Sequence, residues 1–254
     1  MNFLIKTIAF VFYSYVFTLN NVAQGQVKPI EMIAGLSKPP FVIAEDDGGM
    51  QLEIIEAAFA KSNQIVRFTY LPLNRHMDVL HHREFDGIIT LSEHENEWGI
   101  CLSKPYIVYQ NVVVTLTEPA NKIEGFSDLA KLKVAAFQNA TRFLGKEYYD
   151  VFKGAANYTE IANQKSQVNL LFSGRVDALV MDINIFKHLL ANQRLQEPQN
   201  TVYKQEFFTH FLFKPRAYTA GFKDKSLCAL FDQGINSIIA DGSYQEIIDS
   251  YLYF

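Results

Sequence analysis

Short apolar runs alternate with amphipathic segments along the chain. Continuous apolar runs predict buried strands of a parallel sheet, because such strands are covered on both faces. Alternation of apolar and polar residues, as at Val66, Phe68 and Tyr70, also predicts a strand. Strands are therefore expected at 28–34, 64–71, 87–89, 112–116, 133–137, 158–161, 176–182 and 209–213.

Between these strands, apolar residues recur at helical spacing. Leu52, Ile55 and Phe59 share one face, and this spacing predicts a helix at 50–62. Further helices are expected at 164–172, after Asp182, at 224–240, from Ser243, and from the turn 138–142 through Tyr149. Strands that alternate with helices indicate an α/β fold.

Composition is that of a globular protein. The 254 residues are 49% hydrophobic and 20% charged, with a net charge of -4. This mild acidity gives no support to nucleic-acid binding, which favours a basic face. The chain has 21 Phe and 13 Tyr, which suits either an aromatic-lined pocket or a well-filled core.

The first 25 residues have the pattern of a secretory signal peptide. Lys6 supplies the positive charge, 7–19 is a short apolar segment, and the small residues at 23–25 form a cleavage site. We expect cleavage after Gly25, with Ala23 as the alternative. Since no cysteine stands at the cleavage point, we expect a periplasmic protein rather than a lipoprotein or a membrane-anchored one.

Four motifs resemble those of one known family. They are Asp86-Gly87-Ile88-Ile89, Leu102-Ser103-Lys104-Pro105-Tyr106, the run from Gly174 to Asp182, and Asp241-Gly242-Ser243-Tyr244 with Tyr251. In this order, behind a signal peptide, they are similar to those of the bacterial extracellular solute-binding proteins of family 3, the periplasmic amino-acid-binding type. The resemblance covers 27–253.

The resemblance implies a two-lobe periplasmic-binding-protein fold of type II. Each lobe would be a sheet flanked by helices, and two strands would form the hinge. We expect 26–113 and 213–254 in lobe 1 and 114–212 in lobe 2. A monomer that captures a small polar ligand, an amino acid or a related compound, for an ABC-type permease is implied, with no cofactor.

The resemblance also implies a ligand site between the lobes. It places Phe41 against the ligand, and Thr90, Ser92 and Asn96 in the loop after the strand at 87–89. Asn139, Thr141 and Arg142 begin a helix, whose free N–H groups suit a carboxylate. Asp182 would hold an ammonium group, or would merely cap the helix that follows it.

Two positions depart from the family pattern. Asn96 stands where the family has an arginine that grips the ligand carboxylate, and Gly35 stands where it often has an acidic residue. We expect Arg75 or Arg142 to supply the missing positive charge.

Other readings of the sequence remain open. A sensory receptor for a membrane kinase or chemoreceptor fits the same fold. A dehydratase-like enzyme would use a glutamate of the cleft loop, namely Glu93, Glu95 or Glu97. His76, His81, His82 and His94 lack the spacing of a zinc site, so no metal is expected. Both cysteines are expected in the same lobe, as two buried thiols rather than a bridge, although one bridge remains an alternative.

Overall fold

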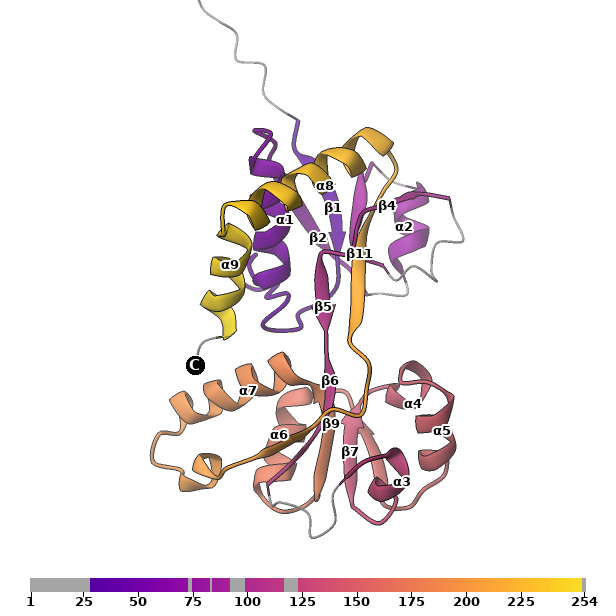
Figure 1. Cartoon of the computed structure of the whole chain (residues 1–254), viewed down its shortest axis with the longest axis vertical. Helices are drawn as coiled ribbons and strands as arrows, with labels where there is room; N and C mark the ends of the chain where they lie inside the picture. The colour runs from indigo at the N-terminus through magenta and orange to yellow at the C-terminus, as the bar shows by residue number, and fades with distance from the viewer. Residues whose placement is uncertain (1–27, 73–74, 83, 92–98, 117–122, 253–254) are drawn as a thin grey trace, which may run out of the picture.

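The chain forms two lobes that are joined by two crossing segments (Figure 1). The computed structural model describes residues 28–252 except 73–74, 83, 92–98 and 117–122. The expected signal peptide therefore lies outside the described residues. None of the described helices is long and apolar enough to cross a membrane.

The first lobe is built on a mixed sheet. Its strand order is β2 (Val66–Tyr70), β1 (Ile30–Ala34), β3 (Gly87–Leu91), β11 (Arg216–Phe222) and β4 (Cys101–Leu102), and β5 (Ile107–Tyr109) also pairs with β11. β1 pairs in parallel with β2 and β3, whereas β11 is antiparallel to β3. The helices of this lobe are α1 (Met50–Ala60), α2 (His76–His82), α8 (Lys225–Ala240) and α9 (Ser243–Leu252).

The second lobe contains the other sheet. Its strand order is β10 (Phe208–His210), β6 (Asn111–Thr115), β9 (Ala178–Asp182), β7 (Val134–Phe137) and β8 (Tyr158–Ile161). Its helices are α3 (Phe126–Leu129), α4 (Ala140–Phe143), α5 (Lys146–Phe152), α6 (Gln164–Phe172), α7 (Ile183–Gln196) and the 3-10 helix η3 (Thr201–Lys204). Two helix-flanked sheets in separate lobes confirm the predicted α/β architecture.

The core of the first lobe depends on a close approach of α1 and α8. A Cβ atom added at Gly234 of α8 would lie 2.1 Å from the carbonyl oxygen of Ala58 of α1. Because glycine leaves this space empty, the fully buried rings of Phe59 and Phe231 meet with centroids 5.5 Å apart. Burying one such ring stabilises the fold by about 1.5–3 kcal/mol.

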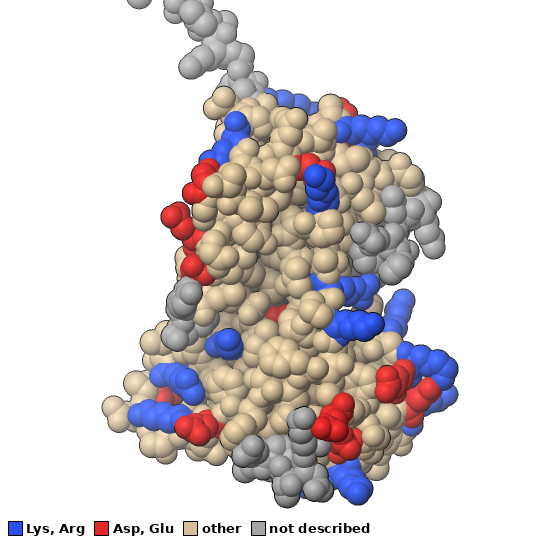
Figure 2. Space-filling model, viewed as in Figure 1, with Lys and Arg blue, Asp and Glu red and all other residues tan. Residues whose placement is uncertain are grey.

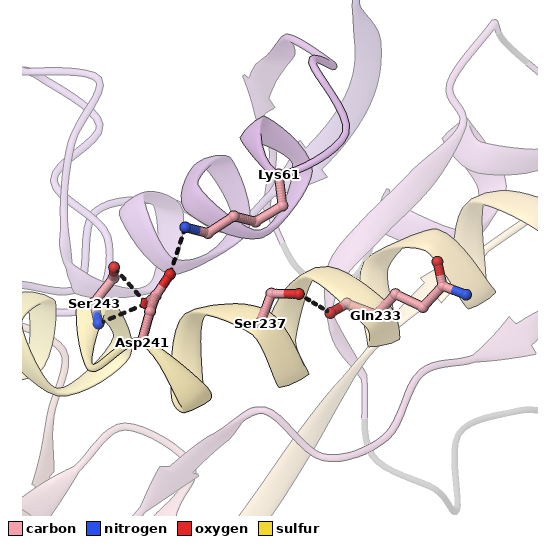
Figure 3. A network of polar contacts seen from close by, with 5 residues as sticks. All are labelled: Lys61, Gln233, Ser237, Asp241 and Ser243. Atoms are coloured by element: carbon pink, nitrogen blue, oxygen red, sulfur yellow. Dashed lines mark hydrogen bonds and ion pairs between the residues drawn. The ribbon is translucent and has the colours of Figure 1, made fainter.

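A polar cluster links α1 to the α8–α9 junction (Figure 3). Lys61 Nζ, just after α1, lies 2.6 Å from Asp241 Oδ2. Ser243, the first residue of α9, donates to Asp241 Oδ1 from its hydroxyl at 2.7 Å and from its backbone N–H at 3.0 Å. These contacts lower the pKa of Asp241, with the bond from Lys61 as the largest cause. Asp241 therefore fixes the start of α9.

The two cysteines form a disulfide, which corrects the expectation of two thiols. Cys101 of β4 and Cys228 of α8 have Cα atoms 6.2 Å apart and are bonded through sulfur. Both elements belong to the first lobe, as expected. A strand and a helix from distant parts of the sequence are therefore covalently joined on one side of the hinge.

Two crossing segments connect the lobes. The first runs from β5 through Gln110 into β6, and the second runs from β10 through 211–215 into β11. Gln110 Nε2 donates to the carbonyl oxygen of Phe213 at 2.9 Å, so one hydrogen bond ties the two crossings together. The expected boundary between 113 and 114 falls inside β6, which belongs as a whole to the second sheet.

Two local features differ from the sequence expectations. The helix expected through Tyr149 is divided into α4 and α5 at Gly145, whose φ of 94° is strained for any residue with a side chain. The strand expected at 209–213 ends at His210, and the long strand β11 follows it. β11 lies between β3 and β4, so it is an internal strand that the sequence interpretation did not include.

Candidate functional site

Two adjoining hollows lie where the lobes meet. Their volumes are about 390 Å³ and about 530 Å³. Both are lined by Lys38, Tyr109, Phe143, Gln164, Arg216 and Tyr218. Phe143 and Gln164 belong to the second lobe and the other four belong to the first lobe or its hinge strands. These hollows therefore form one cleft that both lobes line.

Lys38 is a charged group of this cleft that is partly withdrawn from water. It follows β1 and is half-buried, and its Nζ lies 4.1 Å from the centroid of the Tyr109 ring. Burial lowers the pKa of Lys38 to about 8, and the carboxylate of Asp182 opposes this shift with a smaller effect. The ammonium group is therefore held largely by a ring face and a neighbouring charge.

Arg216 and Tyr218 lie two residues apart on β11 and therefore on the same face of that strand. The guanidinium carbon of Arg216 lies 5.3 Å from the centroid of the Tyr218 ring. The rings of Tyr218 and Tyr109 meet with centroids 5.0 Å apart. Two cations and two tyrosine rings thus cover the first-lobe wall of the cleft. Figure 2 shows Lys and Arg side chains to the right of the junction between the lobes.

The floor of the smaller hollow is a buried hydrogen-bond network around Gln51 of α1. Gln51 Nε2 donates to Thr90 Oγ1 at 2.7 Å and to Tyr106 Oη at 2.7 Å. Gln51 Oε1 accepts from the hydroxyl of Tyr109 at 3.0 Å. Thr90 and Tyr109 line the hollow, so Gln51 positions two of the side chains that line it.

Asp182 ends β9 and lines the larger hollow. Its Oδ1 accepts from the N–H groups of Asn184 and Ile185 at 2.8 and 3.2 Å, so it caps α7. Its Oδ2 accepts from the N–H of Gln110 at 2.8 Å. Burial raises the pKa of Asp182, and these three bonds oppose that shift. Asp182 therefore joins the hinge to the second lobe in addition to facing the cleft.

The helix start that we expected to hold a ligand carboxylate is bound by a carboxylate of the protein itself. Glu160, on β8, accepts from the N–H of Asn139 at 2.7 Å and from the N–H of Thr141 at 2.8 Å. The hydroxyl groups of Thr141 and Tyr158 also donate to it, at 2.7 and 3.0 Å. These bonds outweigh partial burial, which acts in the opposite direction, and lower the pKa of Glu160. Asn139 and Thr141 line neither hollow.

The remaining expected site residues are dispersed. Phe41 is fully buried and packs against Tyr109 with ring centroids 3.9 Å apart, so it supports the cleft from behind. Arg75 and Arg142 are exposed and line neither hollow. Ser92 and Asn96 lie outside the described residues, as do the three glutamates of that loop.

No metal centre is present among the described residues. They contain no group of three or more His, Cys, Asp or Glu side chains that could hold an ion. His76 lines the smaller hollow, and its Nε2 lies 2.9 Å from the carbonyl oxygen of Leu71. Burial lowers the pKa of His76, so its ring is neutral at pH 7.

A cleft lined by both halves of a two-lobe α/β protein defines the class of binding proteins that enclose a small solute. The chain belongs to the bacterial extracellular solute-binding proteins, family 3, whose family model matches residues 30–253. A comparison with curated protein sequences finds no match.

Solved structures with the same fold come from several kinds of protein. One is the arginine-, lysine-, histidine-binding protein ArtJ from the thermophilic bacterium Geobacillus stearothermophilus (16% identity, 88% of this chain, 95% of that chain, TM-score 0.61). Another is a histidine kinase sensor domain similar to periplasmic binding proteins (17% identity, 89% of this chain, 96% of that chain, TM-score 0.64). A third is AncCDT-1, an ancestral amino-acid-binding protein and a precursor of cyclohexadienyl dehydratase (17% identity, 88% of this chain, 95% of that chain, TM-score 0.60). At these identities the likeness shows the fold alone, which is the predicted type II binding-protein fold.

Sequence reasoning missed the groups that line the cleft from the first lobe. Lys38 precedes Pro39 and Pro40 and reads as an ordinary turn lysine. Arg216 and Tyr218 carried one usable signal, which is a cation and an aromatic residue at strand spacing. Glu160 carried none, because two of its partners, Asn139 and Thr141, lie in the turn and helix start that follow β7, about 20 residues away in the sequence.

Proposed function

We propose that this chain is a periplasmic solute-binding protein that captures a small polar ligand between its lobes and delivers it to an ABC-type permease. The observation that carries the proposal is the cleft, because Lys38, Tyr109, Arg216 and Tyr218 face Phe143 and Gln164 across it. A ligand in this position contacts both lobes. Its binding energy therefore favours the closed arrangement over the open one.

The hinge supports such a movement. The lobes are linked by two short crossings, and Gln110 joins these to each other through the carbonyl of Phe213. The N–H of Gln110 is bound by Asp182, so the hinge is tied directly to a side chain that faces the cleft. We propose that the hinge responds to ligand contact with Asp182, which accepts a hydrogen bond from the N–H of Gln110, and with Tyr109, which precedes Gln110 in the sequence.

Two features support export to the periplasm. The first 25 residues have the composition of a signal peptide. The disulfide between Cys101 and Cys228 is typical of an oxidising compartment. We propose that the exported chain acts as a monomer and meets its permease at the membrane surface.

We propose binding rather than catalysis. Among the described residues that line the cleft, Ser37 donates a hydrogen bond from its hydroxyl to the Glu45 carboxylate, but no serine or cysteine there is bonded to a histidine. The resemblance to a dehydratase precursor is one of fold. Incubation with cyclic acids and product detection would identify an enzyme directly.

Lobe closure is the measurement that tests the proposal. Spin labels at Ala60→Cys and Ala156→Cys, which are exposed positions in different lobes, report the distance between the lobes. A second pair at Ala60→Cys and Lys104→Cys lies within the first lobe and serves as the matched control. Addition of the small-molecule fraction of a periplasmic extract should shorten the first distance and leave the second unchanged. No change in either pair contradicts solute capture.

Experiments with the ligand-loaded protein distinguish a role in transport from a role in sensing. Native mass spectrometry of the closed form identifies the captured solute. Stimulation of a reconstituted permease ATPase by that loaded form supports the transport role. Stimulation of a membrane kinase instead supports the sensory role that the sequence also allows.

A further inference from the structure

The charges that line the smaller hollow are unbalanced. Lys38 and Arg216 are its charged side chains, and none of its described lining residues is Asp or Glu. Lys38 is half-buried, and Arg216 is partly buried at the start of β11. Asp182, the carboxylate that interacts with the charge of Lys38, lines only the larger hollow and already accepts three backbone N–H groups. The hollow is therefore better suited to an anion than to the ammonium group of an amino acid.

The hydrogen-bonding capacity of the two cations is unused within the described part of the chain. There, neither Lys38 Nζ nor the Arg216 guanidinium forms a hydrogen bond or an ion pair with another side chain. Each instead lies over a tyrosine ring, at 4.1 Å and 5.3 Å from the ring centroid. A guanidinium group matches a carboxylate through two parallel N–H bonds. Both cations are thus available to an anionic ligand.

Two groups of the second lobe that could bind a zwitterion, the helix start after Asn139 and the carboxylate of Asp182, are already engaged. Glu160 accepts the N–H groups of Asn139 and Thr141, so this helix start is not open to a ligand anion. Asp182 accepts three backbone N–H groups and interacts with the charge of Lys38. The first-lobe cations therefore remain as the anion-binding groups of the cleft.

Flat rings supply the rest of the shared lining. Tyr109, Tyr218 and Phe143 line both hollows, and the smaller one has a volume of about 390 Å³. Small-molecule sites of this size are usually lined by apolar and aromatic side chains that enclose most of the ligand. Ring faces pack well against a flat apolar body.

Building on the function proposed above, we infer that the captured solute is a small aromatic carboxylate. Its carboxylate lies between Lys38 and Arg216, and its ring packs against Tyr109, Tyr218 and Phe143. The ligand needs no ammonium group, in keeping with Gly35 at the end of β1, where no side chain is offered to one.

Titration calorimetry with four defined probes tests this ligand class. Benzoate contains both features, benzamide lacks the charge, cyclohexanecarboxylate lacks the flat ring, and L-arginine adds cationic groups. Benzoate should bind at least tenfold more tightly than benzamide and L-arginine, and also more tightly than cyclohexanecarboxylate. Equal binding of benzamide and benzoate overturns the inference.

Two variants and one control locate the carboxylate. Lys38→Met and Arg216→Gln should each weaken benzoate binding at least tenfold. Lys104→Gln is the matched control, because Lys104 is exposed on the first lobe and lines neither hollow, and the affinity of this variant should stay within twofold of wild type. Circular dichroism confirms that each variant is folded. Unchanged affinity in both cleft variants overturns the inference.

The solute retained from a periplasmic extract separates this inference from the proposed function. An aromatic carboxylate in the native mass spectrum supports both. A neutral or cationic solute that closes the lobes overturns the ligand class and leaves solute capture standing. If no small molecule is retained and the distance between the lobes does not change, both proposals are wrong.

Discussion

Glu160 accepts two hydrogen bonds from Thr141, at 2.8 Å from its backbone N–H and 2.7 Å from its hydroxyl. The register of the sheet explains this pairing, since β7 and β8 run in parallel and Ala136 lies beside Glu160. The turn that follows β7 therefore passes directly over the Glu160 side chain. A carboxylate of the chain stabilises the start of α4, where helix N–H groups would otherwise lack partners.

Replacing Glu160 with Gln should destabilise the protein by about 1–3 kcal/mol, because the amide nitrogen would face an N–H donor and the charge is lost. Folding lowers the pKa of Glu160 from 4.5, so its contribution is present above that pH and is lost as the pH falls through the folded value. The difference between wild type and Glu160→Gln in urea unfolding should therefore shrink on acidification.

Glu206→Gln is the control for this prediction, since Glu206 is exposed in the same lobe. It should change the free energy of unfolding by less than about 0.5 kcal/mol. A Glu160→Gln protein as stable as Glu206→Gln at pH 7 would show that the carboxylate does not stabilise the turn.

Binding of benzoate should weaken in mildly alkaline solution. Lys38 attracts an anion when it is protonated, and its pKa in the ligand-free protein is about 8. Affinity should be constant well below this pKa and fall as the pH rises through it, to about one quarter by pH 8.5. Calorimetry in buffers of matched ionic strength measures this, and Lys38→Arg should remove the pH dependence while keeping affinity.

Removing the charge of Lys38 should also make the protein more stable. The pKa of Lys38 is 10.5 before burial and about 8 in the folded chain, so its charged form opposes folding below pH 8 and this cost disappears as the pH rises. Lys38→Met should raise the free energy of unfolding at pH 7 by about 1 kcal/mol or more. A variant that is more stable and yet binds less benzoate has not lost affinity through misfolding.

Reduction of the disulfide should destabilise the first lobe. The two cysteines are 127 residues apart in sequence, and cross-links that close loops of this length contribute up to about 5 kcal/mol by restricting the unfolded chain. Wild-type protein should unfold at lower urea concentration when dithiothreitol is present. The Cys101→Ala/Cys228→Ala protein should unfold at that lower concentration with or without reductant. A reductant effect on the double variant would point to a different cause.

Gly234→Ala should be among the most damaging single changes in the first lobe. The added Cβ would lie 2.1 Å from the carbonyl oxygen of Ala58, and a backbone atom cannot move aside as a side chain can. Overpacking of this kind costs about 1–3 kcal/mol or more, which exceeds the gain of about 1 kcal/mol in helix propensity.

Ser237→Ala is the matched control on the same helix. Ser237 is exposed, and its hydroxyl donates to the carbonyl of Gln233 one turn earlier (Figure 3). Its unfolding midpoint should stay close to that of wild type. If Gly234→Ala unfolds at the same midpoint, α1 and α8 do not approach as closely as described.

The sequence predicts the fold well where a strand is a continuous apolar run. β9 is fully buried along its length and was expected at its observed place. β11 begins with Arg216, and its register shifts near Gly221, where a Cβ would lie 2.5 Å from Leu91 Cδ1. Such a strand carries no apolar run. Its position depends on its pairing with β3, and the local sequence pattern holds no information on that pairing.

The candidate site was predictable only in part for a similar reason. Asp182 stands at the end of a predicted strand, which is a local feature, and the sequence there allows both a capping and a cleft-facing carboxylate. Lys38, Arg216 and Tyr218 come together because distant elements meet at the cleft. Glu160 reaches the turn at Asn139 through the pairing of two strands. Pairings across the sheet, rather than residue types, decide which side chains are available to a ligand.

The disulfide encloses the whole second lobe in a covalent ring. Both crossings lie between Cys101 and Cys228, so the chain leaves the first lobe and returns to it within the closed loop. A protease that cuts once anywhere in this loop produces two fragments that stay attached through sulfur. Nicked molecules should therefore migrate as a single species until a reductant separates them.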